Sequence, residues 1–183
     1  MTRPAQPVTG VLLVGGASSR FGSPKALARF RGETLAERAW RLLGEVCDER
    51  LAFGKAAEAG GLPFPLLDDG TGVRAPLAGL VAGLRAAPAG RVLALPVDCP
   101  LLEADDLRLL TAARGAVAVP QTGPLPGVYG QLALAPLEAA LAAGRLKLRD
   151  AIAGLDVVVV ELEPQRLANA NTPADLEELA RLT

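Results

Sequence analysis

Short apolar runs alternate along the chain with longer stretches in which apolar positions recur every three or four residues. The first pattern is typical of buried strands and the second of amphipathic helices. Strands are expected at residues 8–14, 49–53, 64–67, 91–97, 115–119, 127–134 and 156–161. Helices are expected at residues 33–44, 76–86, 103–113, 136–143, 147–153 and 173–181. This alternation predicts an α/β fold with a mostly parallel sheet flanked by helices.

The expected ends of two segments follow from particular residues. Asn171 or Thr172 can cap the last helix, and Pro173 suits its first turn. The stretch PQTGPLPG at 120–127 predicts a long loop, because its prolines and glycines disfavour any regular element. With no internal repeat or linker, residues 1–183 are expected to form a single domain.

Composition narrows the class of protein. Half of the residues are hydrophobic but only 3% are aromatic, so the core must be built from Leu, Val and Ala. The net charge of −1 argues against a nucleic-acid partner held by bulk phosphate attraction. There is no His, and Cys47 and Cys99 are expected to be small buried residues, which excludes a Cys/His zinc site. No signal-peptide core or membrane-spanning run is visible, so we expect a cytoplasmic protein with no membrane partner.

The stretch VLLVGGASSRFGSPK at 11–25 is the most informative in the chain. An apolar strand leads into a loop of small residues and two cations: Gly15, Gly16, Ser18, Ser19, Arg20, Gly22 and Lys25. Small residues let backbone N–H groups approach an anion closely, and the cations add positive charge. The loop therefore predicts polyphosphate binding, although its spacing is neither a Walker A loop nor G-x-G-x-x-G. The alternative is an ordinary strand-to-helix connection with solvated charges.

Carboxylates follow two other expected strands. Asp68 and Asp69 come after 64–67, and Asp98 comes after 91–97. Because ligands of open α/β sheets bind at the carboxyl ends of strands, these residues and the glycine loop should meet at one edge. A single Asp can hold Mg²⁺ together with phosphates and water, which favours Asp98 as a metal ligand. Alternatively Asp98 is solvated or caps the helix at 103–113, although Glu103 and its acidic neighbours could cap it instead.

The glycine loop resembles the signature L-A-G-G-x-S-x-R-M-G-x-x-K of the molybdenum cofactor guanylyltransferases, within the wider family of Rossmann-like NTP transferases. Three further segments agree in order: APLAGL at 75–80, LPVDCPLL at 95–102 and NANTPADLEEL at 169–179. The departures are Val14 for Ala, Phe21 for Met, Ala75 for Gly, and VDCP where CDMP is commoner.

The resemblance implies a single-domain Rossmann-like nucleotidyltransferase that transfers GMP from GTP to molybdopterin and releases pyrophosphate. It implies Mg²⁺ as cofactor, with Asp98 as the metal ligand and Arg20, Lys25 and Asp98 as catalytic residues. The nucleotide-binding residues that it implies are Leu13, Val14, Gly15, Gly16, Ser18, Lys25, Asp68, Asp69, Pro76, Leu77 and Asn169.

Several of these assignments have structural alternatives. One of Asp68 and Asp69 would contact the guanine base, or the pair opens the turn before Gly70. The segment 76–79 would lie beside the base and ribose, or it is a helix start packed tightly on the sheet. Asn169 would point toward the active edge while a neighbouring residue caps the helix.

Two further segments complete the comparison with the family. The basic stretch 144–152 is either a solvated helix face or a patch that meets the terminal phosphate of the pterin. The Asn that relatives often carry near the base, at the end of the second strand, is absent, since LAFGK offers Ala52 and Gly54 there.

Two other classes of function stay open at this point. One is a related cytidylyltransferase or sugar-phosphate nucleotidyltransferase, although Gly15 favours guanine because pterin cytidylyltransferases resemble L-A-A-G there. The other is a catalytically silent, nucleotide-binding regulatory protein, against which the intact Arg20, Lys25 and Asp98 argue. The expected partners are GTP and molybdopterin, and transient contact with proteins that deliver molybdopterin or mature molybdoenzymes is left open.

Overall fold

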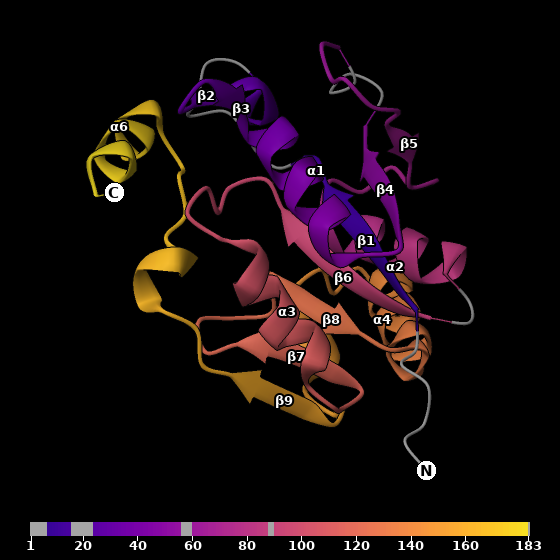
Figure 1. The fold of residues 1–183 in the computed structure, drawn as a ribbon. Helices are drawn as coiled ribbons and strands as arrows, with labels where there is room; N and C mark the ends of the chain where they lie inside the picture. Colours follow the sequence, from indigo (N-terminus) through magenta and orange to yellow (C-terminus); the bar gives the residue numbers. More distant parts are fainter. Residues whose placement is uncertain (1–6, 16–23, 56–59, 88–89, 183) are drawn as a thin grey trace.

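The structure, a computed structural model, describes residues 7–15, 24–55, 60–87 and 90–182. Its strands are β1 (Val8–Leu13), β2 (Arg29–Phe30), β3 (Glu33–Thr34), β4 (Glu49–Gly54), β5 (Leu67–Asp68), β6 (Arg91–Pro96), β7 (Val117–Pro120), β8 (Gly127–Tyr129) and β9 (Val157–Val160). Its α-helices are α1 (Leu35–Val46), α2 (Pro76–Ala86), α3 (Ala104–Ala112), α4 (Leu134–Ala142), α5 (Leu148–Ile152) and α6 (Pro173–Arg181). Short 3₁₀ turns are η2 (Lys25–Leu27), η4 (Gln131–Ala133) and η5 (Pro164–Leu167). Figure 1 shows their arrangement.

A central sheet organises the molecule. Within the described residues it has seven strands, in the order β5-β4-β1-β6-β8-β7-β9. The strands β5, β4, β1 and β6 pair in parallel, and so do β7 and β9. Strand β8 runs antiparallel to both of its neighbours, β6 and β7. The expected α/β fold with a mostly parallel sheet is confirmed.

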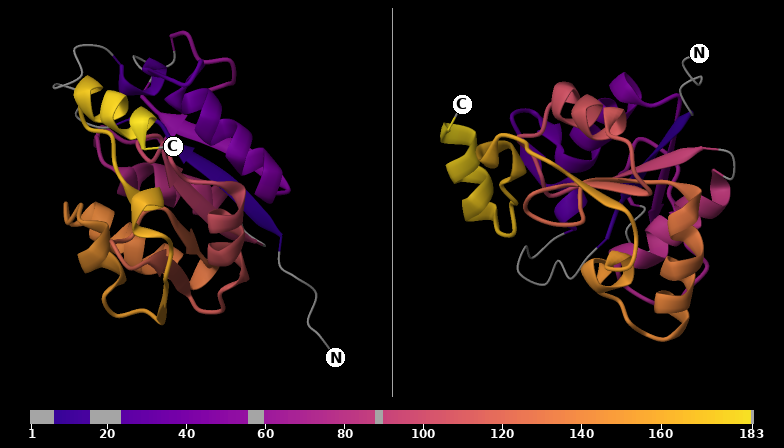
Figure 2. Two further views of the ribbon diagram at one scale, coloured as in Figure 1. Left: turned by 60° about the vertical axis from the view of Figure 1, so that its left-hand side comes forward. Right: turned by 90° about the horizontal axis from the view of Figure 1, so that it is seen from below.

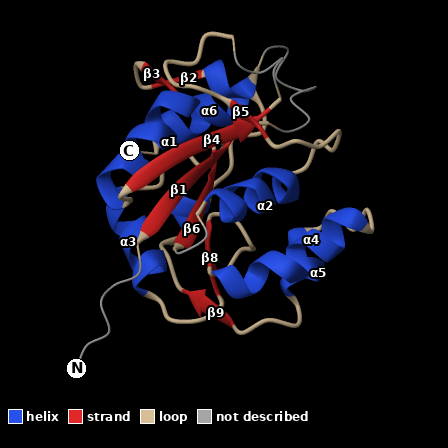
Figure 3. Ribbon diagram, turned by 90° about the vertical axis from the view of Figure 1, so that its right-hand side faces the viewer, coloured by secondary structure: helices blue, strands red, loops and turns tan. Residues whose placement is uncertain are grey.

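Helices cover both faces of the sheet (Figures 1 and 3). Helices α1 and α3 lie on one face, and α2, α4 and α5 lie on the other. Side chains of β1 alternate between them, since Leu12 packs with the α1 side whereas Val11 and Leu13 pack with the α2 side. Because successive strand residues point to opposite faces, one continuous apolar strand supplies both cores.

Helix α2 approaches the sheet closely because two of its residues lack a side chain. A Cβ added at Gly83 would lie 2.6 Å from Cγ2 of Val11, and one at Gly79 would lie 2.8 Å from Cδ2 of Leu13. Both distances are shorter than a carbon–carbon contact allows. The tight packing expected for the segment 76–79 is therefore present, and it places the first turn of α2 next to the end of β1.

Two of the expected strands were wrong in extent. The strand expected at 64–67 is replaced by the short edge strand β5, because Pro63 and Pro65 have no N–H to pair with β4. The strand expected at 127–134 ends at Tyr129, where Gly130 begins a turn that leads into η4 and α4.

A small hairpin at 29–34 was missed. Strands β2 and β3 pair through a two-residue turn in which Arg31 and Gly32 both have positive φ, 52° and 89°. This hairpin lies beside α6 (Figure 2). Arg31 donates to the carbonyl of Ala180 in α6. In the described part of the chain, no helix combines the length and the apolar character needed to cross a membrane.

Candidate active site

The carboxyl ends of four parallel strands open at the same edge of the sheet. Strand β1 leads to Gly15, β4 to Lys55, β5 to Asp69 and β6 to Asp98. Gly15 has φ of +145°, a backbone conformation open to glycine and strained for other residues, so the chain can turn away directly after β1. The convergence expected from the sequence is confirmed for those residues that the structure describes.

Lys25 lies at the centre of a polar cluster on this edge. Its ammonium is 3.2 Å from Oδ2 of Asp98 and 3.1 Å from Oδ1 of Asn171, to which it donates. The side chains of Lys25 and Asp98 are 16% and 27% exposed, so the pair is mostly buried and reaches the surface in part. The N–H of Ala170 donates to the carbonyl of Asp98 at 2.9 Å, which fixes the segment of Asn171 against the end of β6.

Asp98 does not cap a helix. Helix α3 begins at Ala104 with Glu103 as its N-cap, and the Glu103 N–H donates to Asp106 at 2.9 Å. Glu103 and Asp106 thus cap α3, which is one of the two alternatives that the sequence allowed. The carboxylate of Asp98 is turned toward Lys25 instead.

Asn169 and Asn171 make different contacts. The buried thiol of Cys99 lies 3.0 Å from Oδ1 of Asn169, whereas Oδ1 of Asn171 accepts from Lys25. Burial, together with the charge of Asp98, raises the pKa of Cys99 well above its usual range, so the thiol stays protonated and can donate. Thr172 caps α6 in a capping box with Asp175, which leaves the Asn171 side chain to reach the cluster. The role of Asn171 was missed, although its N-x-N spacing beside Asn169 was the available signal.

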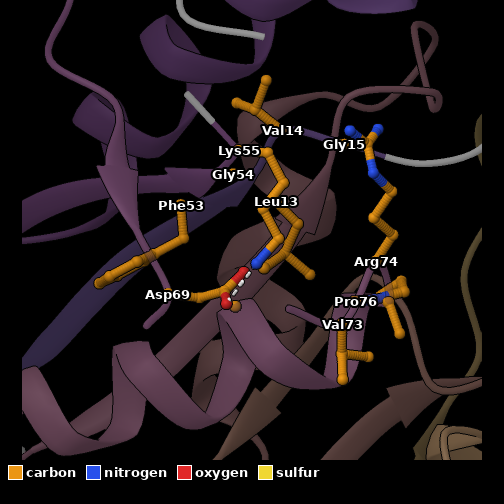
Figure 4. A pocket seen from close by; sticks show the side chains of 12 residues that line it. Leu13, Val14, Gly15, Phe53, Gly54, Lys55, Asp69, Val73, Arg74 and Pro76 are labelled. Carbon is orange, nitrogen blue, oxygen red and sulfur yellow. Dashed lines mark hydrogen bonds and ion pairs between the residues drawn. The ribbon is translucent and has the colours of Figure 1, made fainter. Parts of the chain in front are cut away.

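A small pocket of about 30 Å³ lies at the same edge of the sheet, between the ends of β1 and β4 and the start of α2 (Figure 4). Its lining residues are Leu13, Val14, Gly15, Phe53, Gly54, Lys55, Asp69, Val73, Arg74, Ala75, Pro76 and Gly79. Of the nucleotide-binding residues expected from the sequence, Leu13, Val14, Gly15, Asp69 and Pro76 are in this lining.

The two neighbouring carboxylates differ in position. Asp69 lines the pocket with a side chain only 5% exposed, and it accepts from the N–H and the hydroxyl of Thr71. Asp68 is exposed, and its Oδ1 accepts from the N–H of Gly70 at 2.7 Å. Asp68 therefore stabilises the turn before Gly70, the structural alternative to a contact with the base. Of the two, Asp69 is therefore the one placed to meet a ligand in the pocket.

Asp69 is held in its charged form. Burial alone would raise its pKa, but hydrogen bonds from Lys55 and Thr71 outweigh the burial and lower the pKa of the carboxyl below its usual value. The ammonium of Lys55 is 2.6 Å from Oδ1 of Asp69 and 2.6 Å from the carbonyl of Thr71. The pocket wall thus presents a cation and an anion side by side.

Sequence reasoning missed Lys55 and Arg74 in this pocket. Lys55 follows the last residue of β4 directly, and it is one of only three lysines in the chain, which was the available signal. Arg74 comes two residues before the start of α2, and its side chain extends along the pocket toward Gly15 (Figure 4).

The remaining expected site residues lie elsewhere. Leu77 is fully buried and packs in the core on the α2 side, so its side chain fills the core and not the pocket. Gly16, Ser18 and Arg20 lie outside the described residues. The basic residues of 144–152 (Arg145, Lys147 and Arg149) are exposed around the start of α5.

The oxygens of this edge suit a hard cation. Asp98 and Asn171 offer a carboxylate and an amide oxygen, the ligand types that Mg²⁺ prefers. Over residues 7–15, 24–55, 60–87 and 90–182, no three His, Cys, Asp or Glu side chains gather as a metal cluster. A site with one carboxylate fits a metal that takes most of its ligands from substrate phosphates and water.

Curated relatives resemble the chain over nearly its full length. It is 40% identical over 186 residues to a probable molybdenum cofactor guanylyltransferase of Deinococcus radiodurans, covering 95% of this chain and 94% of that protein. It is 36% identical over 206 residues to a molybdenum cofactor guanylyltransferase of Burkholderia ambifaria, covering 97% and 98%.

Solved structures share the fold. Molybdopterin-guanine dinucleotide biosynthesis protein A of Archaeoglobus fulgidus superposes with a TM-score of 0.80 at 22% identity, covering 95% of this chain and 97% of that one. A 2-C-methyl-D-erythritol 4-phosphate cytidylyltransferase of Thermus thermophilus superposes with a TM-score of 0.69 at 23% identity, covering 94% and 96%. The model of the MobA-like NTP transferase domain matches residues 10–162. With this match and the curated relatives, the chain belongs to the MobA-like NTP transferase family of nucleotidyltransferases.

Proposed function

We propose that this protein is a molybdenum cofactor guanylyltransferase: it transfers GMP from GTP to molybdopterin and releases pyrophosphate. The observation that carries the proposal is the cluster of Lys25, Asp98 and Asn171 at the carboxyl edge of the sheet, the same edge at which the pocket lined by Asp69 opens. A cation for the phosphates and a pocket for the base on one edge are what a nucleoside triphosphate needs. The names of the curated relatives support molybdopterin as acceptor and guanine as base.

Within this proposal the pocket takes the base and the cluster takes the phosphates. Leu13, Val14, Gly15 and Pro76 would line the base and ribose, and Asp69 would accept from the N1–H and the amino group of guanine. Asn169, through its contact with Cys99, would support the loop that follows β6.

Lys25 is the catalytic cation in this account. Negative charge accumulates on the leaving pyrophosphate as the bond to the α-phosphorus breaks, and an ammonium at that point stabilises it. Lys25 reaches the cluster from η2, at the end of the glycine loop, so its flexible stem can follow the phosphate. Arg20, by its place in the same loop, would add a second cation.

We propose Mg²⁺ as the metal, with Asp98 as its protein carboxylate and Asn171 as a neighbouring oxygen. When bound, the ion would neutralise negative charge on the phosphates of the substrate. The attacking group is the phosphate of molybdopterin, which is already an anion. No general base is then required, and a chain without histidine is sufficient.

The exposed basic residues Arg145, Lys147 and Arg149 are the proposed docking point for the pterin phosphate. We further propose that residues 1–183 act as one nucleotidyltransferase domain, and that the protein works in the cytoplasm, where GTP is available. Contact with proteins that supply molybdopterin or receive its dinucleotide would be transient.

Thermal melting with each of the four NTPs and Mg²⁺ tests the nucleotide assignment. GTP at about 100 times its Kd should stabilise the fold by roughly 2.7 kcal/mol, and CTP at the same concentration by much less. Equal or greater stabilisation by CTP or UTP would overturn the guanylyl assignment.

A further inference from the structure

The polar group at the end of β4 belongs to Lys55. Phe53 and Gly54 at the end of this strand contribute an apolar side chain and backbone to the pocket lining, and Lys55 directly after them adds a charged group. The ammonium of Lys55 lies inside the pocket, 2.6 Å from Oδ1 of Asp69, and the two side chains are only 15% and 5% exposed. Figure 4 shows the two groups meeting beneath Leu13.

A lysine and an aspartate side by side present a fixed pattern of hydrogen bonding. The ammonium can only donate, and the ionised carboxylate can only accept. Hydrogen bonds from Lys55 and Thr71 keep the carboxyl of Asp69 ionised, which preserves its accepting character in a mostly buried position. The rest of the lining near the pair is largely apolar, including Leu13, Phe53 and Val73. Few other polar groups therefore compete with a ligand for hydrogen bonds to Lys55 and Asp69.

Among the four bases, guanine matches this pattern best. Its O6 accepts, and the adjacent N1–H and N2 amino group both donate, so O6 can face an ammonium while the donors face a carboxylate. Adenine and cytosine place an amino donor where guanine has O6, which would face the ammonium. Uracil presents an acceptor, a donor and a second acceptor, and the second acceptor would face the carboxylate. A site that leaves buried polar groups unpaired with the wrong base discriminates strongly against it.

We propose that Lys55 is a specificity-determining residue of the nucleotide pocket, whose ammonium donates to O6 of guanine while Asp69 accepts from N1–H and the amino group. This inference rests on the proposed guanylyltransferase function. The pocket is small, about 30 Å³, so we expect side chains in its wall, Lys55 among them, to shift when a base enters. The unbranched stem of lysine allows that movement without a change in the backbone.

The test compares GTP with 6-thio-GTP, in which sulfur replaces O6 as a weaker acceptor and N1–H is retained. Dissociation constants are measured by calorimetry for the wild type and Lys55→Met, with Mg²⁺ present. Arg85→Met is the matched control, because it removes a cation from an exposed ion pair with Glu138, away from the pocket. The wild type and the control should prefer GTP over 6-thio-GTP by about tenfold or more, the usual scale of one charged hydrogen bond.

In Lys55→Met the preference for GTP over 6-thio-GTP should fall to about one, because the donor that distinguishes them is gone. Inosine triphosphate, which lacks only the amino group, provides a second comparison. Its ratio to GTP reports the Asp69 contact separately from the contact at O6. An equal loss of affinity for GTP and 6-thio-GTP would overturn the proposal, since Lys55 would then only hold Asp69 in place.

Two further measurements keep the test decisive. If Lys55→Met does not fold in a melting assay, Lys55→Gln keeps an uncharged N–H donor and should show a reduced but measurable preference. Equal binding of GTP and 6-thio-GTP by the wild type would overturn the role of Lys55 without any variant.

The failure of this proposal and the failure of the guanylyltransferase function can be told apart. If the wild type prefers GTP over CTP, UTP and ATP but does not distinguish GTP from 6-thio-GTP, the guanylyltransferase function stands and the role of Lys55 does not. A wild type without preference for GTP overturns both.

Discussion

The ammonium of Lys25 lies 3.2 Å from Oδ2 of Asp98, although 73 residues separate the two in the sequence. One belongs to the turn η2 that follows the glycine loop, and the other follows β6, a parallel neighbour of β1. Adjacent parallel strands end at the same edge, so the fold itself brings this pair together. The pair joins the proposed phosphate site to the proposed metal site.

Replacing Lys25 by alanine should cut turnover on the order of 10²–10³-fold, since one electrostatic contact to the leaving phosphates is lost. The melting temperature without ligand should fall moderately, because Lys25 and Asp98 are mostly buried and the variant leaves Asp98 without this partner. Steady-state pyrophosphate release measures the loss. Arg108→Ala is the control, because it removes a cation from an exposed pair with Asp105 on α3. Activity of Lys25→Ala close to that of the control would show that Lys25 is structural.

Replacing Asp98 by asparagine removes a charge but little volume. If Asp98 holds the metal, the Mg²⁺ concentration for half-maximal activity should rise on the order of tenfold or more, and the maximal rate should fall. The unliganded variant should melt close to the wild type, because Glu103 and not Asp98 caps α3. Titration of Mg²⁺ against pyrophosphate release gives the comparison, and superimposable curves would remove Asp98 from the mechanism.

Asp69 should give the stability of the unliganded protein a dependence on acid pH. Its pKa in the folded state is lowered from 3.8, against burial and through hydrogen bonds from Lys55 and Thr71. A depressed pKa contributes stability that is present above the unfolded value and is lost as the pH falls through the folded value. Asp69→Asn should therefore be less stable than the wild type at pH 7, and the difference should shrink below pH 3.8. Urea unfolding at both ends of this range measures it, and a gap that does not depend on pH would contradict the ion pair.

Gly83→Ala should destabilise the fold even though alanine favours helices. The added Cβ would lie 2.6 Å from Cγ2 of Val11, a β-branched residue in the central strand that cannot move aside. Overpacking of about 1–3 kcal/mol then outweighs the helix propensity gain of about 1 kcal/mol. Gly154→Ala, where the Cβ would meet nothing within 4 Å, serves as the control. Denaturant unfolding of the two variants should separate them, and equal midpoints would mean that α2 can shift away from the sheet.

Local signals were enough to place much of the fold. The helices at 76–86 and 173–181 were predicted with the observed bounds, because a proline marks the first turn of each and Thr172 caps the second. The strands expected at 64–67 and 127–134 were too long, since apolar character alone does not reveal missing N–H groups or a turn at Gly130. The antiparallel insertion of β8 depends on tertiary pairing, which no local pattern reports.

The site residues, like the fold, fall into those that the sequence predicts and those that only the structure identifies. Residues at the ends of expected strands, such as Asp98, were found because parallel strands deliver their carboxyl ends to one edge. The choice between Asp68 and Asp69 required the structure, since which carboxylate faces inward depends on the turn that follows β5. Lys55 and Asn171 gain their positions from contacts across more than ten residues of sequence, and the sequence alone does not show such contacts.

The central claim is that this enzyme joins GMP to molybdopterin, and transfer of label tests it directly. The purified protein is incubated with molybdopterin, Mg²⁺ and GTP or CTP labelled at the α-phosphate, and the pterin product is isolated. We expect label from GTP in a pterin dinucleotide, pyrophosphate in equal amount, and little transfer from CTP. Transfer from CTP at a rate equal to or above that from GTP, or pyrophosphate release without labelled pterin, would contradict the account.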